Sequence, residues 1–267
     1  MTVDYRANDP ATGRTVVLTV PSAESTDSPT LLARFYREAR AAGALQHPNI
    51  VAIYDLGVDR GAPYIASELL EGATLEEIVK REKKDGAQSP QSAAVLLDYI
   101  IQACRGLAFA HQHGVIHRDV RPGNIFVTDR GVVKLTHFAL ARLPDALSPI
   151  SAGVQSGTID YMSPEQMRGD RVDACTDIWA MGCTLYEILT YTKPFHAQSD
   201  KEWMLAILTH QPKPIREMRP DLPAELDKVL RRALKKDRPG RYQSMDKLAA
   251  DLEPIAGRLQ ASGSAGV

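Results

Sequence analysis

The strongest constraint on the fold is a change in residue pattern at Gly72. Before it, short runs of β-branched residues are bounded by glycine, proline and small polar residues. This pattern indicates strands over residues 16–20, 51–55 and 63–68. After Gly72, apolar residues recur every three or four positions over long stretches, which indicates helices. Strands and helices in separate parts of a chain predict an α+β fold, with a small strand-rich lobe before a larger helical lobe.

Apolar spacing and terminal residues predict the main helices. One lies in the first lobe and ends near Gly43. A second covers residues 91–113, with Ser89 as its expected N-cap, and a third covers about 177–190. The chain from residue 222 onward is also expected to be helical.

The lobes are expected to divide the chain into residues 1–70 and residues 71–260. The charged run at residues 80–85 is expected to form a solvated loop. The small residues 261–267 are expected to form a flexible tail.

Composition narrows the class of protein. The net charge of −1 over 267 residues offers no broad electrostatic attraction for nucleic acid. No signal peptide is recognised, and charged residues interrupt the longest apolar stretches, so no membrane span is expected. Three cysteines form no metal-binding pattern, which favours reduced thiols and a cytoplasmic location.

Residues 117–124 read His-Arg-Asp-Val-Arg-Pro-Gly-Asn. This octapeptide resembles the catalytic loop of protein kinases. In that family Asp119 would orient the substrate hydroxyl, Asn124 would hold a metal ion, and Arg121 would keep the positive charge of the usual lysine. The same residues could instead hold the loop together structurally, so both interpretations stay open.

Further motifs extend the resemblance over essentially the whole chain, closest to bacterial Hanks-type Ser/Thr kinases. Residues 157–165 look like the end of a kinase activation segment, and residues 177–179 followed by Gly182 resemble the helix that anchors the catalytic loop. Residues 47–51 fit the stretch after the kinase C-helix. The resemblance assigns structural roles to Glu38, His117, Phe138, Glu165, Asp177 and Arg241.

The resemblance implies a two-lobed kinase fold with a truncated antiparallel sheet in the N-lobe and a mostly helical C-lobe. It also places an adenine pocket at the hinge between the lobes, with Val17, Glu68, Leu70 and Phe126 around it. ATP and Mg²⁺ would be the cofactors of an active member of this family.

Several positions depart from the kinase pattern. Thr19 stands where kinases have the strand lysine, and His137 stands where they have the metal-binding aspartate. Asn124 would therefore be the remaining metal ligand. Asp4 replaces an apolar residue above the purine, and the only glycines before residue 50 are Gly13 and Gly43, so no Gly-rich loop is recognised.

These departures favour a pseudokinase, a kinase-shaped module that regulates or scaffolds a protein partner through the C-lobe and the activation segment. Such a module would need no cofactor. A weakly active Ser/Thr kinase is the main alternative, with Asp119 orienting the acceptor hydroxyl, and another nucleotide-dependent transferase is a third.

Overall fold

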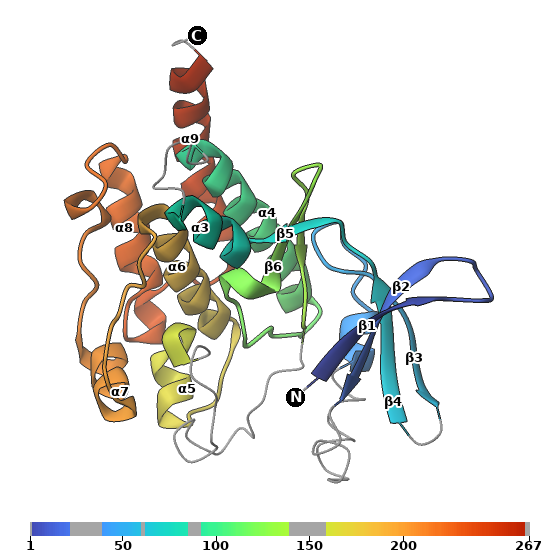
Figure 1. Ribbon diagram of the computed structural model, residues 1–267. Coiled ribbons are helices and arrows are strands. Elements are labelled where there is room, and N and C mark those ends of the chain that lie inside the picture. The colour runs from blue at the N-terminus through green and yellow to red at the C-terminus, as the bar shows by residue number, and fades with distance from the viewer. Residues whose placement is uncertain (1, 22–38, 60–61, 85–91, 139–158, 265–267) are drawn as a thin grey trace.

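The computed structural model describes residues 2–21, 39–59, 62–84, 92–138 and 159–264. Figure 1 shows a sheet on one side of the molecule and most of the helices on the other. The α+β arrangement expected from the sequence is therefore present. The predicted division at residues 70 and 71 stays a prediction.

Four antiparallel strands form the sheet of the smaller lobe. They are β1 (Thr2–Asn8), β2 (Thr15–Pro21), β3 (Ile53–Asp59) and β4 (Ala62–Glu68), in the spatial order β1-β2-β4-β3. The strand predicted at residues 16–20 is confirmed within β2. In the register of β1 and β2, Asp4 lies opposite Thr19. Residues 39–43 are helical, with Ala39 and Ala42 buried, and the helix ends near Gly43, as expected.

The strand predicted at residues 51–55 is wrong at its start, because β3 begins at Ile53. Val51 donates its backbone N–H to Leu135 across the boundary between the lobes, and Ile50 forms a parallel bridge with the same residue. The backbone of Ile50 and Val51 pairs with β7, so these two residues do not extend β3 alongside β4.

A second, smaller sheet lies in the larger lobe. It consists of β5 (Gly72–Thr74), β6 (Ile125–Thr128) and β7 (Val133–Leu135), all antiparallel in that order. Because Leu135 of β7 also contacts residues 50 and 51, this sheet links the two lobes.

Helices form the rest of the larger lobe. They are α3 (Leu75–Lys84), α4 (Ala93–Gln112), α5 (Pro164–Arg168), α6 (Ala174–Thr190), α7 (Asp200–Thr209), α8 (Ala224–Ala233) and α9 (Met245–Ser264). The long helices α4, α6 and α9 pack together with α8 around one apolar core. Leu97 and Ile100 of α4 and Ile178 of α6 are fully buried there.

The structure corrects two predictions about helix ends. The N-cap of α4 is Ser92, not Ser89: its hydroxyl accepts a hydrogen bond from the Val95 N–H at 3.3 Å. Ser89 itself lies outside the described residues. The charged residues 80–84 belong to α3 rather than to a loop, since Leu75 and Ile78 bury one face and leave the charges on the other.

α9 continues to Ser264, so residues 261–264 of the expected tail are helical, and the flexibility of the tail stays a prediction. Alanine and serine do not stop a helix that is already formed, and the Ser262 hydroxyl donates to the Arg258 carbonyl at 2.9 Å.

Among the described helices, α4 alone is long and apolar enough to cross a membrane. However, 67% of its apolar stretch is buried inside the protein, where it packs against α6 and α9. A core helix meets the same length and composition criteria, so α4 is weak evidence for a membrane span.

Candidate functional site

The loop that carries the octapeptide is anchored by a buried carboxylate. Asp177, in the first turn of α6, accepts backbone N–H bonds from His117 at 2.8 Å and Arg118 at 2.7 Å. His111 of α4 donates to the same carboxylate at 2.7 Å. Burial alone would raise the pKa of Asp177, but the bond and charge of His111 outweigh it and hold that pKa below its ordinary value. Asp177 therefore connects the loop to α4 and α6.

Asp119 and Asn124 meet at the surface of this loop. The Asn124 amide donates to the Asp119 backbone carbonyl at 2.7 Å and to its carboxylate at 2.8 Å. Asn124 is buried in the short helical turn Pro122–Asn124, whereas Asp119 and Arg121 are partly exposed. The structure thus brings together the predicted catalytic residues, and one donor group of Asn124 is already used within the loop.

His117 and Phe138 pack against each other, with ring centroids 4.6 Å apart. The His117 Nε2–H donates to the Thr136 carbonyl at 3.0 Å, which joins the loop to the strand end at β7. Phe138 also lines a cavity together with Ala42 and Ile53. Glu38, the remaining member of the predicted structural set near this point, lies outside the described residues.

A cavity of about 220 Å³ lies between the lobes. All four residues predicted for the adenine pocket line it, as do Thr19 and His137. The full lining is Asp4, Val17, Thr19, Ala42, Ile50, Val51, Ile53, Ile65, Ser67, Glu68, Leu69, Leu70, Thr74, Gly123, Phe126, Thr136, His137 and Phe138. The walls are mainly apolar.

One corner of the cavity is polar. The Thr19 hydroxyl donates to Oδ1 of Asp4 at 2.6 Å, across the pair β1 and β2. The other carboxylate oxygen, Oδ2, lies 3.9 Å from Nε2 of His137. Burial lowers the pKa of His137, and the nearby Asp4 carboxylate only partly opposes this. His137 adopts a left-handed backbone conformation, with φ of 59°. We call Asp4, Thr19 and His137 the acidic corner.

At the hinge, the Glu68 carboxylate is bound from two directions. Lys134 of β7 donates to it at 2.9 Å, and the Ala52 N–H lies at 3.2 Å. Sequence reasoning missed Lys134, because nothing in a three-residue strand indicates which side chain it will meet across the cleft. It identified Asp4 as unusual but not the bond to Thr19.

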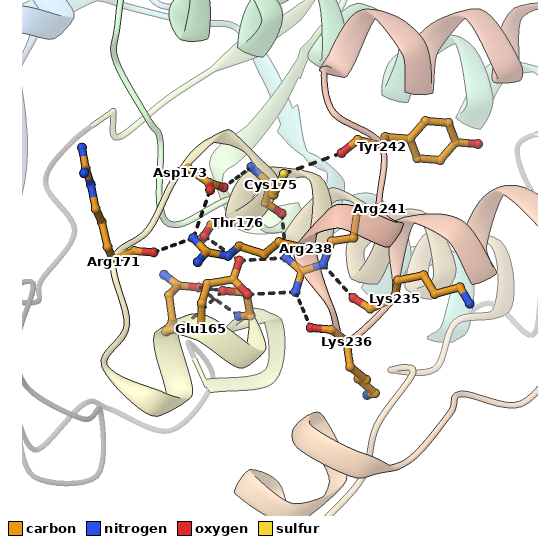
Figure 2. Close-up of polar contacts among 12 residues, drawn as sticks. Glu165, Arg171, Asp173, Cys175, Thr176, Lys235, Lys236, Arg238, Arg241 and Tyr242 are labelled. Carbon is orange, nitrogen blue, oxygen red and sulfur yellow. Dashed lines mark hydrogen bonds and ion pairs between the residues drawn. The ribbon is translucent and has the colours of Figure 1, made fainter.

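The structure also brings Glu165 and Arg241 together in the core of the larger lobe (Figure 2). The two side chains form a two-pronged pair at 2.7 and 2.8 Å, and both residues are at least 98% buried. Arg238 nearby binds the Arg171 carbonyl and Asp173, which holds the loop before α6. These contacts lie away from the cavity.

No group of three or more His, Cys, Asp and Glu side chains could hold a metal ion within the described part of the chain.

Comparison with known proteins assigns the family. Residues 2–251 match the family model for the protein kinase domain. The serine/threonine-protein kinase PknB of Mycobacterium leprae is 39% identical over 253 residues, which cover 93% of this chain and 40% of that protein. The tyrosine-protein kinase MasK of Myxococcus xanthus is 37% identical over 260 residues, covering 94% and 40%. The chain therefore spans about two fifths of the length of these relatives.

Solved structures agree with the sequence matches. The kinase domain of Mycobacterium tuberculosis PknI superposes with a TM-score of 0.75 at 26% identity, covering 96% of this chain and 91% of that one. The antiparallel sheet of the small lobe and the helical large lobe are the kinase fold expected from the sequence. The chain belongs to the protein kinase domain family, and its relatives include bacterial Ser/Thr kinases of the Hanks type.

Proposed function

We propose that this kinase domain is a pseudokinase that regulates or scaffolds a protein partner. The observation that carries the proposal is the acidic corner, where a carboxylate lies between the two positions from which kinases hold phosphate and metal. On the correspondence drawn from the sequence, those positions are Thr19 and His137.

The charges around the cavity do not suit a nucleoside triphosphate, which is an anion. Kinases surround the phosphates with a lysine, metal ions and a Gly-rich loop. Here no lysine or arginine is among the described residues that line the cavity. Its two carboxylates are Asp4 and Glu68, and only Glu68 is neutralised by a lysine. An added triphosphate would therefore meet an unpaired carboxylate.

The metal position is equally unsuitable. Mg²⁺ prefers oxygen ligands, and His137 offers an imidazole in place of a carboxylate. The side chain of Asn124 donates its N–H to Asp119, and its carbonyl oxygen is the one atom it could offer to a metal, so Asn124 would supply a single neutral ligand. The residues present thus do not fit ATP with Mg²⁺. Loss of a single preorganised electrostatic group costs about 3–4 kcal/mol in a reaction barrier.

The catalytic loop then has a structural role in the proposal. Asp119, Arg121 and Asn124 would be retained because the loop joins α4, α6 and β6, not because they act on a substrate. The partner surface would be the C-lobe with the activation segment. Most of that segment, residues 139–158, lies outside the described residues.

A weakly active protein kinase is the second candidate. The contact between Asn124 and the Asp119 carboxylate at 2.8 Å favours it, since the loop keeps the arrangement that a hydroxyl-orienting aspartate needs. The curated relatives are themselves named as kinases.

A nucleotide titration tests the proposal. The purified protein is heated with increasing ATP, with and without Mg²⁺ or Mn²⁺, and its unfolding temperature is recorded. A ligand at 100 times its Kd stabilises a fold by about 2.7 kcal/mol, which such a measurement detects easily. We expect no metal-dependent shift at millimolar nucleotide.

A metal-dependent shift would support the weak kinase instead. The next measurement would then be phosphate transfer followed by mass spectrometry, with Asp119→Ala as the variant. Transfer that Asp119→Ala abolishes would refute the pseudokinase proposal.

The partner surface has its own test. Once a protein partner is in hand, removal of residues 148–156 should weaken its binding. Unchanged affinity would exclude the activation segment from the interface, while leaving the rest of the C-lobe as a candidate.

A further inference from the structure

Two cations share one buried aromatic side chain in the core of the larger lobe. The centroid of the Trp179 ring lies 5.1 Å from the Arg241 guanidinium and 4.8 Å from the Lys236 ammonium. Phe195 stacks parallel to Trp179 with centroids 5.7 Å apart, and its own centroid is 4.3 Å from the same ammonium. Lys236 therefore lies against two aromatic rings, and neither ring lines the cavity between the lobes.

The charges of this group do not balance. Both carboxylate oxygens of Glu165 are bound by Arg241, and the side chain of Lys236 is directed away from Glu165 (Figure 2). Within the described part of the chain, Lys236 forms no ion pair with a carboxylate; its ammonium donates to backbone carbonyls instead. Protonated Lys236 thus leaves one positive charge in surplus. A charge that is removed from water without a counter-charge is unfavourable.

The surplus charge lies directly under α7. The Lys236 ammonium donates to the carbonyl of Ile207 at 2.8 Å and contacts that of Ala206 at 3.4 Å, both near the C-terminal end of the helix. Ala206 and Ile207 are also the two buried side chains among the residues of α7 whose burial is described, whereas Leu205 is 54% exposed. The part of α7 that is seated in the core is therefore the part that rests on the ammonium.

We propose that α7 is a pH-sensitive element of the fold, which docks loosely while Lys236 is protonated and tightly once Lys236 is neutral. The inference goes beyond the proposed function and does not depend on it, because it concerns neither the cavity nor the catalytic loop.

The sign of the effect follows from linkage. Burial lowers the pKa of Lys236 from the ordinary 10.5 to about 8 while α7 is docked. When α7 moves away, water reaches the ammonium and its pKa returns toward the ordinary value. Between these two values the docked form holds fewer protons, so docking strengthens as the pH rises. A full return to 10.5 makes docking about tenfold more favourable at pH 9 than at pH 7.

The other titratable groups around Lys236 do not produce this effect. Cys183 of α6 faces Lys236, but burial raises the pKa of its thiol, so it stays neutral over this range. Arg241 also faces Lys236 and stays charged. His210 follows α7, and its backbone N–H donates to the Ala206 carbonyl at 3.0 Å. Variants of Lys236 leave His210 in place and so separate the two.

Hydrogen–deuterium exchange of the whole chain tests the inference. Exchange of the backbone amides of α7 is followed by mass spectrometry at pH 7 and pH 9 and divided by the intrinsic rate at each pH. The amides of α9 report unfolding of the whole protein. We expect α7 to be less protected than α9 at pH 7, and its protection to rise about tenfold at pH 9.

Two substitutions of Lys236 and one control identify the group responsible. Lys236→Met removes the titrating group, and Lys236→Arg keeps a cation that stays protonated over this range. Both should abolish the pH dependence of α7 protection, whatever each does to its level. Lys201→Met removes an exposed lysine from α7 itself and should keep the tenfold change.

Three results would overturn the inference. One is equal protection of α7 at pH 7 and pH 9 in the unchanged protein. Another is a tenfold change that survives in Lys236→Met or in Lys236→Arg. The third is exchange of α7 only together with α9, which would mean that α7 does not open by itself.

Discussion

Replacement of Arg241 should be among the most destabilising single changes in the larger lobe. Five hydrogen bonds hold its buried guanidinium. Two go to the Glu165 carboxylate, at 2.7 and 2.8 Å. The other three go to the carbonyls of Lys235 at 2.7 Å, Cys175 at 3.0 Å and Lys236 at 3.2 Å. Arg241 thereby ties α5, α6 and the loop after α8 to one another (Figure 2).

The magnitude follows from what the variant leaves behind. Arg241→Met keeps much of the apolar stem but leaves a carboxylate that is 2% exposed without its partner. Removing one member of a buried ion pair costs about 3–5 kcal/mol. For a chain of this size that corresponds to a fall of roughly 6–20 °C in unfolding temperature. Arg241→Lys keeps the charge but has three donors in place of five, so it should lose part of this stability rather than none.

The pH dependence of the loss has a definite sign. Burial would raise the pKa of Glu165, but the bonds and charge of Arg241 outweigh it, so the pKa in the folded protein lies below the ordinary 4.5. The contribution of this pair to the unfolding free energy therefore has its full value above pH 4.5. It declines as the pH falls through the lower pKa that Glu165 has in the folded protein. In Arg241→Met, burial is opposed only by the hydrogen bonds that Glu165 keeps from Thr176 and the backbone, so the pKa of Glu165 rises and protonation at low pH costs the variant less stability than it costs the unchanged protein. The difference in unfolding free energy between the two proteins should be smaller at pH 4 than at pH 7.

The assay is urea unfolding followed by circular dichroism, at both pH values, for the two Arg241 variants, Glu165→Gln and the double variant Glu165→Gln/Arg241→Met. The double-mutant cycle isolates the coupling between the side chains. The reasoning is refuted if Arg241→Lys is as stable as the unchanged protein, or if the destabilisation by Arg241→Met grows as the pH falls.

Two further predictions concern packing in the same lobe. Burial raises the pKa of all three cysteine thiols, to about 11 for Cys175. None of them should therefore react with a thiol reagent at pH 8 until the protein is unfolded. A thiol that reacts in the native protein would contradict this. Gly182→Ala should destabilise the protein by about 1–3 kcal/mol, because the added Cβ would lie 3.0 Å from side-chain atoms of Ala233 and Leu234. Gly257→Ala, a change into open space in α9, is its control and should be neutral or stabilising in the same thermal-unfolding measurement.

The sequence predicts the members of the site better than it predicts their contacts. Val17, Phe126 and His137, assigned to the pocket from motifs far apart in the chain, all line one cavity. Motif spacing carries this information because each motif has a fixed place in the kinase fold. Pairings across strands or lobes depend on register, which a single strand does not encode. The bonds from Thr19 to Asp4 and from Lys134 to Glu68 were therefore not predictable.

Helix interiors were likewise easier to predict than helix ends. The apolar face of α4 is clear from its periodicity, but Ser89 and Ser92 are equally good N-cap residues in sequence. Which one caps the helix depends on where the preceding chain enters. For α3, the run of charged residues 80–84 led to the prediction of a loop, because the buried face of the helix consists of only a few residues.

The acidic corner also determines what would restore a nucleotide site. Thr19→Lys alone reinstates the family lysine, yet residue 19 lies opposite Asp4 in the β-sheet register, and the Thr19 hydroxyl is already 2.6 Å from that carboxylate. The new ammonium would pair with Asp4, as opposite charges across two strands do. We expect Thr19→Lys to give no metal-dependent ATP shift in thermal unfolding.

The triple variant Asp4→Val/Thr19→Lys/His137→Asp removes the competing carboxylate and supplies a metal ligand at the same time. It should gain a metal-dependent stabilisation, about 2.7 kcal/mol when ATP reaches 100 times its Kd. Asp4→Val alone should not, because it provides no cation. If instead Thr19→Lys by itself binds ATP as well as the triple variant does, Asp4 is no barrier to phosphate. In that case the missing lysine alone would account for the loss of ATP binding. The phosphate of ATP would have replaced Asp4 as the partner of the introduced lysine ammonium, so the Asp4 carboxylate would contribute little to the selectivity of the cavity.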